Sequence, residues 1–289
     1  MGSASVESTS ENTVRRSLVL GGGGVIGSAW MAGLAAELRH RGIDLGVADS
    51  VVGTSAGAII GAALLTGLDL FSFADNPYPP GSPKPPQVVV KPELVAASFS
   101  ALFDRTSDRE VAARKVGRLA MAEAPAQPAH IAPMQWLLGG NDWPDHRLRI
   151  VAVNADTGHR QVWDSGVPLA TAVTASRSIP GLFPPVAVAD RYYIDGGFWS
   201  PTNADLAADS DIVLVVEPLA NRFPPEQVQA ELASTMTSAV VRFCPDAATI
   251  DVFNAFATKP DLAVSWPEAF RAGVRQADDL AQRLIDAGW

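Results

Sequence analysis

The side chain best placed for chemistry is Ser55, in the pentapeptide Gly-Thr-Ser-Ala-Gly at Gly53–Gly57. This G-x-S-x-G pattern follows a short apolar run, Asp49–Val52, and precedes an alanine-rich apolar stretch, Ala58–Leu65, which predicts strand, tight turn and helix. The flanking glycines permit the sharp turn, and the helix N-terminus directs free amides at the reaction centre. The pattern predicts that Ser55 is a nucleophile. The simpler interpretation is an N-capping serine in a packed turn.

A glycine-rich loop, Gly21–Gly27, precedes this motif in the chain. Its spacing matches the dinucleotide fingerprint G-x-G-x-x-G, which also needs an acidic residue about 20 positions later. Asp44 is available, but it follows Gly42 and does not clearly end a second strand. The alternative is an oxyanion hole, because consecutive glycine amides converge on a negative oxygen without steric conflict. The nearby serine motif favours the oxyanion hole over the dinucleotide site, and a purely structural glycine turn is the third interpretation.

A serine nucleophile needs a base, and histidine is the usual one. The four histidines (His40, His130, His146 and His159) fall in a charged helix end, a proline-broken region and a turn, where surface or structural roles are expected. Asp195 is better placed, since it ends a strand-like run, Arg191–Ile194, and precedes two glycines. We expect that strand to be parallel, which puts Asp195 on the ligand side of an open α/β sheet. An ordinary Asp-Gly-Gly turn is the alternative.

Together these pieces resemble the patatin-like phospholipase family. That family has a glycine-rich loop after the first strand, a G-x-S-x-G motif one unit later and a distant D-G-[GA], which correspond here to Gly21–Gly27, Gly53–Gly57 and Asp195–Gly197. Two stretches before the aspartate, Ala175–Pro180 and Phe183–Val186, are also similar to the family. The resemblance covers about residues 17–70 and 147–217.

The resemblance implies a Ser–Asp dyad, with Ser55 attacking an ester carbonyl and Asp195 acting as the base in place of histidine. It also implies that Gly53 and Gly57 shape the nucleophile elbow. The oxyanion would be bound by the backbone amides of three consecutive glycines, namely Gly22, Gly23 and Gly24. One position departs from the family, which commonly has arginine just before the last glycine of the loop, where this chain has Ile26.

The sequence predicts a three-layer α/β/α fold with a mainly parallel central sheet. Residues 1–14 are polar and Ser/Thr-rich, and we expect a disordered tail there. Residues 15–289 are expected to form a single patatin-like domain. Within it, residues 71–146 are expected to form a largely helical cap insertion, because residues 76–92 contain seven prolines and helical spacing then follows.

Composition excludes several classes of protein. Hydrophobic residues make up 47% of the 289 residues and charged residues 18%, which excludes disorder of the whole chain. The net charge of −9 disfavours nucleic acid as a partner. One cysteine and the histidine spacing predict neither a disulfide framework nor a metal site, and no cofactor is expected. Two long uncharged windows, residues 17–36 and 50–68, contain too much glycine for membrane spans.

We therefore expect a serine acyl hydrolase of lipid esters, of the phospholipase A, lysophospholipase or carboxylesterase type. An acyltransferase or a narrow esterase would use the same dyad, and a catalytically weak lipid-binding protein is the third alternative. Partners are expected to be a lipid or other acyl ester and, transiently, a membrane surface contacted through apolar groups. No secretory signal is recognisable, so a cytoplasmic location with peripheral membrane contact is expected. Chain length, head group and oligomeric state stay open.

Overall fold

The computed structural model describes residues 14–78, 81–83, 86–87, 89–103, 108–123, 125–126, 128–235 and 237–289. The predicted tail, residues 1–14, lies outside these ranges except for Val14, as do parts of the proline-rich segment 76–92.

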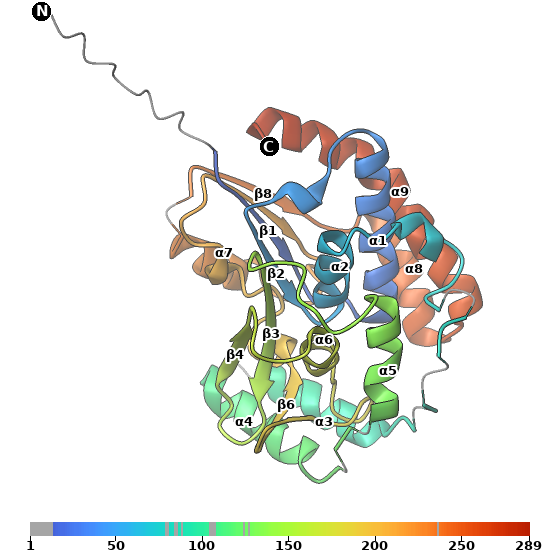
Figure 1. The fold of residues 1–289 in the computed structure, drawn as a ribbon, viewed down its shortest axis with the longest axis vertical. Helices are drawn as coiled ribbons and strands as arrows, with labels where there is room; N and C mark the ends of the chain where they lie inside the picture. The colour runs from blue at the N-terminus through green and yellow to red at the C-terminus, as the bar shows by residue number, and fades with distance from the viewer. Residues whose placement is uncertain are drawn as a thin grey trace, which may run out of the picture.

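Within the described residues, eight strands form one sheet in the order β5-β6-β3-β2-β1-β7-β8, and β4 pairs with β3 beside this path (Figure 1). The five strands from β3 to β8 in this order are parallel, whereas β4 and β6 run antiparallel to β3. The predicted three-layer fold with a mainly parallel sheet is confirmed. The strands are β1 Arg16–Leu20, β2 Ser50–Thr54, β3 Leu148–Asn154, β4 Arg160–Trp163, β5 Val186–Val188, β6 Arg191–Asp195, β7 Ile212–Val216 and β8 Ala239–Phe243.

The direction of β6 corrects one expectation. β6 is antiparallel to β3, not parallel, so Asp195 does not lie at the carboxyl end of a parallel strand. It nevertheless reaches the level of Ser55, because β6 begins beyond the end of β3 and runs back until Asp195 pairs with Ala152. The neighbouring residue of β3, Val151, pairs with Thr54 on the other side. The returning strand therefore ends at the same height in the sheet as the serine motif.

Helices cover both faces of this sheet (Figure 1). On one face, α1, α2, α6 and α9 pack over the strands and form the larger core. On the other face, η4 and α7 cover β1, β2 and β7, and α4 covers β3 and β6. The helices are α1 Gly24–His40, α2 Ala56–Leu65, α3 Pro92–Leu102, α4 Arg109–Ala120, α5 Pro128–Leu137, α6 Leu169–Ser176, α7 Pro225–Ala233, α8 Ala247–Thr258 and α9 Leu262–Ala287, with short 3₁₀ turns η1 Leu45–Val47, η2 Leu70–Phe73, η3 Gly196–Phe198 and η4 Ala204–Ala207.

The central strands are buried on both faces, as their continuous apolar sequences require. In β1, Leu18 and Leu20 pack into the larger core while Val19 packs into the opposite one. This alternation follows the two-residue period of a strand, and helices on both sides remove both faces from water. The uncharged windows of the sequence are therefore buried sheet and helix. Among the described residues, no helix combines the length and apolar character needed to cross a membrane.

The segment 71–146 carries α3, α4 and α5 and connects the parallel strands β2 and β3. Its α4 packs against β3 and β6, with Ala113 and Val116 in the same cluster as Val153 and Ile194. Its α5 instead packs against α6. The segment thus contributes to both outer layers of the fold.

The final helix, α9, packs along the whole first helix, α1 (Figure 1). Two glycines allow this close approach. A Cβ at Gly33 would lie 2.0 Å from the carbonyl oxygen of Phe270, and one at Gly273 would lie 2.1 Å from that of Trp30. The two helix backbones are therefore in direct contact, which only glycine permits at these positions.

Candidate active site

Ser55 occupies the turn between β2 and α2 in a backbone conformation that side chains rarely adopt, with φ 55° and ψ −115°. The surrounding packing enforces this turn. A Cβ at Gly57 would lie 1.9 Å from the carbonyl oxygen of Leu20, and one at Gly53 would lie 2.6 Å from the Cα of Ala58. The glycines let α2 start directly against the ends of β1 and β2. The turn therefore has the strained geometry of a nucleophile elbow.

The Ser55 hydroxyl donates a hydrogen bond to Asp195, with 2.6 Å between Oγ and Oδ2. The other carboxylate oxygen, Oδ1, accepts the backbone N–H of Gly197 at 2.7 Å. Both side chains are buried, with 5% of Ser55 and 3% of Asp195 exposed. The structure thus brings together the two residues that the sequence singled out, and the Gly197 amide fixes the orientation of the carboxylate.

Burial raises the pKa of Asp195 to about 7, because the charged form loses its hydration. Hydrogen bonds from Ser55 and Gly197 and the positive charge of Arg177 act in the opposite direction on this pKa. A carboxylate with a pKa near neutrality can hold a proton that it has just accepted, whereas an ordinary aspartate would release it. Asp195 therefore has the electrostatic environment of a general base.

Ser176, at the end of α6, is a supporting residue to which sequence reasoning gave no role. Its hydroxyl accepts the backbone N–H of Ser55 at 2.9 Å and donates to the carbonyl of Val151 at 2.6 Å. It is fully buried. The hydroxyl thus ties the strained turn to the neighbouring strand β3. Its place in the stretch Ala175–Pro180 was the only sequence signal available.

The glycine loop lies beside Ser55, since a Cβ at Gly22 would be 3.7 Å from the Cβ of Ser55. The Gly22 N–H, however, donates to the carbonyl of Pro201 at 2.8 Å. Gly23 and Gly24 stand at the start of α1, where amides have no acceptor within the helix, and Gly24 has φ +60°. Of the three predicted oxyanion amides, two are therefore presented at a helix N-terminus, and the first is already paired.

The loop after Asp195 is held by a buried carboxylate. Glu231 on α7 accepts the hydroxyl of Thr202 at 2.9 Å and the backbone N–H of Ala204 at 3.0 Å. In the same loop, the Asn203 side chain donates to Thr54 at 3.0 Å. These bonds fix the segment whose Pro201 carbonyl contacts the glycine loop. One loop therefore positions both the aspartate and the candidate oxyanion hole.

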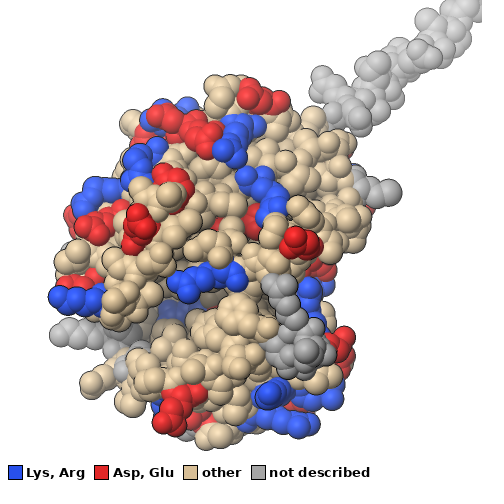
Figure 2. Space-filling view, turned by 180° about the vertical axis from the view of Figure 1, so that it is seen from behind, with Lys and Arg blue, Asp and Glu red and all other residues tan. Residues whose placement is uncertain are grey.

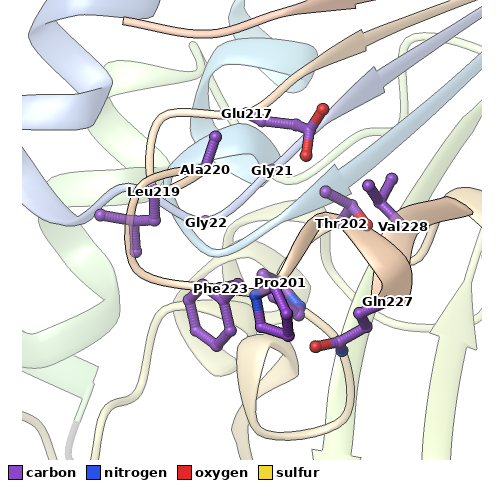
Figure 3. Close-up of a pocket in the computed structure, with 11 residues that line it drawn as sticks. Gly21, Gly22, Pro201, Thr202, Glu217, Leu219, Ala220, Phe223, Gln227 and Val228 are labelled. Atoms are coloured by element: carbon purple, nitrogen blue, oxygen red, sulfur yellow. The ribbon is translucent and has the colours of Figure 1, made fainter. Parts of the chain in front are cut away.

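Two apolar cavities meet at Ser55. The larger, about 130 Å³, lies among α1, α2, α5 and the loop after α6. The smaller, about 50 Å³, contains both Ser55 and Asp195 and is walled by Phe99, Leu102 and Phe223. A third pocket of about 20 Å³ adjoins it, in which Phe223 and Pro201 lie side by side below Gly22 (Figure 3). The hydroxyl of Ser55 is thus accessible from two apolar spaces.

The sequence model of the patatin-like phospholipase family matches residues 18–208, which is more than half of the chain. The chain belongs to this family. The matched range contains the patatin-like glycine loop, the serine motif and Asp195, so the resemblance seen in the sequence is confirmed.

Curated relatives include uncharacterised NTE family proteins of Mycobacterium bovis and Mycobacterium tuberculosis. Each is 30% identical over 217 residues, which cover 73% of this chain and 31% of the relative. The chain therefore spans about a third of the length of these curated relatives.

Among solved structures, VipD from Legionella pneumophila has a TM-score of 0.43 and 14% identity, and the alignment covers 93% of this chain and 67% of VipD. The type III effector protein ExoU has a TM-score of 0.44 and 17% identity, with coverage of 95% and 53% respectively.

The departure from the patatin-like pattern at Ile26 has a structural explanation. Ile26 is only 4% exposed and belongs to the larger hydrophobic core. A position packed in this way contributes to the hydrophobic interior, not to the charge of the site. The loop therefore carries no cation at this position.

The histidines do not take part in the site geometry. His40, His146 and His159 are exposed, and His130 lines two cavities that contain neither Ser55 nor Asp195. The part of the chain that the structure describes also contains no group of His, Cys, Asp or Glu side chains suited to a metal ion.

Proposed function

We propose that this chain is a serine acyl hydrolase of lipid esters, with Ser55 as nucleophile and Asp195 as general base. The observation that carries the proposal is the 2.6 Å hydrogen bond from Ser55 to Asp195 at a strained strand–helix turn. A hydroxyl in contact with a base of matched pKa is the arrangement that activates serine.

In the proposed first step, Ser55 Oγ forms a bond to the ester carbonyl carbon while Asp195 accepts its proton. The carbonyl oxygen becomes an oxyanion, and we assign its stabilisation to the amides of Gly23 and Gly24 at the start of α1. Gly22 would join them only if its amide left the Pro201 carbonyl. Collapse of the intermediate breaks the bond to the alcohol, which leaves with the proton from Asp195.

The second step returns the enzyme to its starting state. A water molecule gives a proton to Asp195 and attacks the acyl-serine, and the tetrahedral intermediate then releases the carboxylic acid. The proton on Asp195 returns to Ser55 Oγ as that bond breaks. The same carboxylate thus acts as base and then as acid in both halves of the reaction.

We propose the segment 71–146 as the cap of the site. It contributes Phe73, Tyr78, Met134 and Leu137 to the larger cavity and Phe99 to the smaller one. These side chains give both cavities an apolar wall, which suits the hydrocarbon parts of an ester.

Contact with a lipid surface, on this proposal, is apolar and transient. Val89, Val90 and Phe103, all within the proposed cap, are exposed. Acidic and basic side chains are interspersed on the face shown in Figure 2, which is hollowed across its middle. Such a mixed surface does not support docking by charge alone.

The decisive experiment combines a p-nitrophenyl ester assay with labelling by a fluorophosphonate probe. We expect the wild type to hydrolyse the ester and take up the probe, and Ser55→Ala to do neither. Asp195→Asn should be inactive while keeping its fold. Labelling that survives Ser55→Ala would refute the nucleophile, and an inactive, unlabelled wild type would favour a lipid-binding role.

A further inference from the structure

Arg177 is a cation in the wall of an otherwise apolar cavity. It follows Ser176 directly, and its side chain lines the larger cavity together with Ser55. The guanidinium carbon lies 4.4 Å from the centre of the Phe183 ring, which is the stacked geometry of a cation–π contact.

The guanidinium of Arg177 lacks a hydrogen-bonding partner among the residues that the structure describes. Its five N–H donors reach no acceptor there, and none of the ion pairs in the described ranges includes it. Asp195 interacts with it electrostatically, but the two oxygens of that carboxylate accept Ser55 and Gly197. Burial lowers the pKa of Arg177, because the cation loses hydration, and Tyr78 and Asp195 act in the opposite direction on this pKa. The Arg177 side chain is only partly buried, and none of its nitrogens is among the buried, unpartnered polar atoms of the described residues. Its donors are therefore accessible to a ligand in the cavities that it lines.

The position of Arg177 connects the serine with the surface. Arg177, Tyr78 and Phe183 also line a narrow cavity of about 20 Å³ on the other side. That cavity shares Phe183 and His130 with a surface cavity of about 290 Å³, whose rim includes the ion pair of Lys91 and Glu123. The cation therefore stands between the reactive hydroxyl and a space large enough for a polar group.

We propose that Arg177 is a specificity-determining residue that binds an anionic oxygen group on the alcohol side of the substrate ester. The planar guanidinium presents paired donors that match a phosphate or carboxylate. The acyl side is excluded, because a hydrocarbon chain has no anion to offer. The substrate class is thus an anionic or zwitterionic acyl ester, such as a lysophospholipid, in preference to a neutral glyceride. This inference rests on the proposed function of Ser55.

The kinetic test compares three soluble octanoyl esters that differ only on the alcohol side. Monooctanoylglycerol is neutral, octanoyl lysophosphatidylcholine carries a phosphodiester, and octanoyl glycolate carries a carboxylate. We expect wild type to prefer one of the two anion-bearing esters, and the one preferred identifies the source of the anion. In Arg177→Gln, the ratio of kcat/KM for that ester to kcat/KM for the neutral ester should fall roughly 10- to 100-fold, the range for a charged hydrogen bond.

Two variants serve as controls. Arg177→Lys keeps the charge but not the paired donors, so its ratio should be intermediate. Arg271→Gln removes an exposed arginine from α9 and should leave the ratio at the wild-type value. Assays at about pH 9, above the pKa of Asp195 near 7, keep that carboxylate ionised in every variant. An equal loss on all three esters would overturn the proposal, as would a wild type without preference.

A binding measurement separates this proposal from the proposed function. Ser55→Ala and the double variant Ser55→Ala/Arg177→Gln are titrated with octyl phosphate while thermal unfolding is followed. We expect octyl phosphate to raise the Tm of Ser55→Ala and to have a smaller effect on the double variant. Equal shifts, or no shift in either, would refute anion binding at Arg177. Failure of Ser55 as nucleophile would leave this result unchanged.

Discussion

Ser55 and Asp195 share one hydrogen bond, yet the fold holds them by opposite means. Ser55 has a strained backbone, with φ 55°, and the close packing of Gly53 and Gly57 keeps it there. Asp195 has an ordinary extended backbone, with φ −50° and ψ 131°. Its unfavourable feature is electrostatic, since burial raises its pKa to about 7. The strain at Ser55 is thus conformational, whereas the unfavourable feature of Asp195 is the burial of its charge.

Ser55 and Asp195 should therefore respond to different kinds of change. A change of side-chain volume next to the elbow should displace Ser55, whereas a change of pH should alter the charge of Asp195. Because one hydrogen bond joins the two side chains, either change should lower the rate of the proposed ester hydrolysis.

The largest effect is expected when the aspartate loses its charge but keeps its shape. Asp195→Asn should lower kcat for ester hydrolysis roughly 10³- to 10⁴-fold, because an amide cannot accept the serine proton. Steady-state kinetics with circular dichroism as a folding control would measure this. Near-wild-type turnover would mean that another group is the base.

The strongest test of the packing that holds Ser55 is to add a methyl group at the elbow. Gly57→Ala places a Cβ 1.9 Å from the Leu20 carbonyl, so α2 must move. We expect activity to fall more than about 100-fold and unfolding free energy to drop by roughly 3 kcal/mol, as for overpacked cores. Gly61→Ala in the same helix is the control, since its nearest neighbour is a Val51 methyl at 3.1 Å. Equal behaviour of the two variants would contradict the argument.

The pH dependence of ester hydrolysis tests the role of the Asp195 charge. Because Asp195 must be ionised to accept a proton and its pKa is about 7, kcat/KM should fall about tenfold per pH unit below 7 and level off above it. The rate of fluorophosphonate labelling should follow the same curve, which excludes a titrating substrate. A rate that is constant between about pH 5 and pH 8 would refute Asp195 as the titrating base.

A smaller loss of activity is expected from a change at Ser176, which supports the elbow. Ser176→Ala removes the acceptor of the Ser55 N–H and leaves that amide unpaired, a change worth about 1–3 kcal/mol. We expect kcat/KM to fall roughly tenfold. Ser178→Ala is matched in size and burial but bonds only within the α6 turn, at Thr174. An equal loss in Ser178→Ala would show that the effect is a general loss of packing.

The smallest expected effect is a gain in stability. In the folded chain the pKa of Asp195 is raised from its ordinary 3.8 to about 7, so the folded state binds the proton more tightly. The stability that this proton contributes is complete below about pH 4 and is lost as pH rises to 7. Asp195→Asn should therefore have a higher Tm than wild type at about pH 8, by roughly 2–4 °C per kcal/mol, and a similar Tm at pH 4. A lower Tm at pH 8 would contradict the burial argument.

The serine turn could be predicted from the sequence because its cause is local. The close approach of α2 to β1 and β2 requires glycine at Gly53 and Gly57, and both glycines can be seen in the sequence. Asp195 was also found, but with the wrong strand direction. Whether β6 runs parallel or antiparallel depends on its partner β3, far away in the chain, and both directions suit the run Arg191–Ile194.

Other features could not be predicted from the sequence, because contacts between residues far apart in the chain create them. β8, Ala239–Phe243, is a half-exposed strand without clear alternation and was not predicted. The pairing of the Gly22 amide with Pro201 joins two loops that no spacing relates. Arg177 reads as an ordinary polar residue after a helix. Only the fold shows that Tyr78 and Phe183 enclose it.

The contact of α1 with α9 also has a consequence for the order of folding during synthesis. Gly33 and Gly273, which bring the two helices together, are separated by 240 positions in the chain. At about 5–20 residues per second, a ribosome needs roughly 12–50 s to make the intervening segment. During that time the side of α1 that packs against α9 lacks this partner helix. A nascent chain must therefore keep this side of α1 from other contacts until α9 has been made.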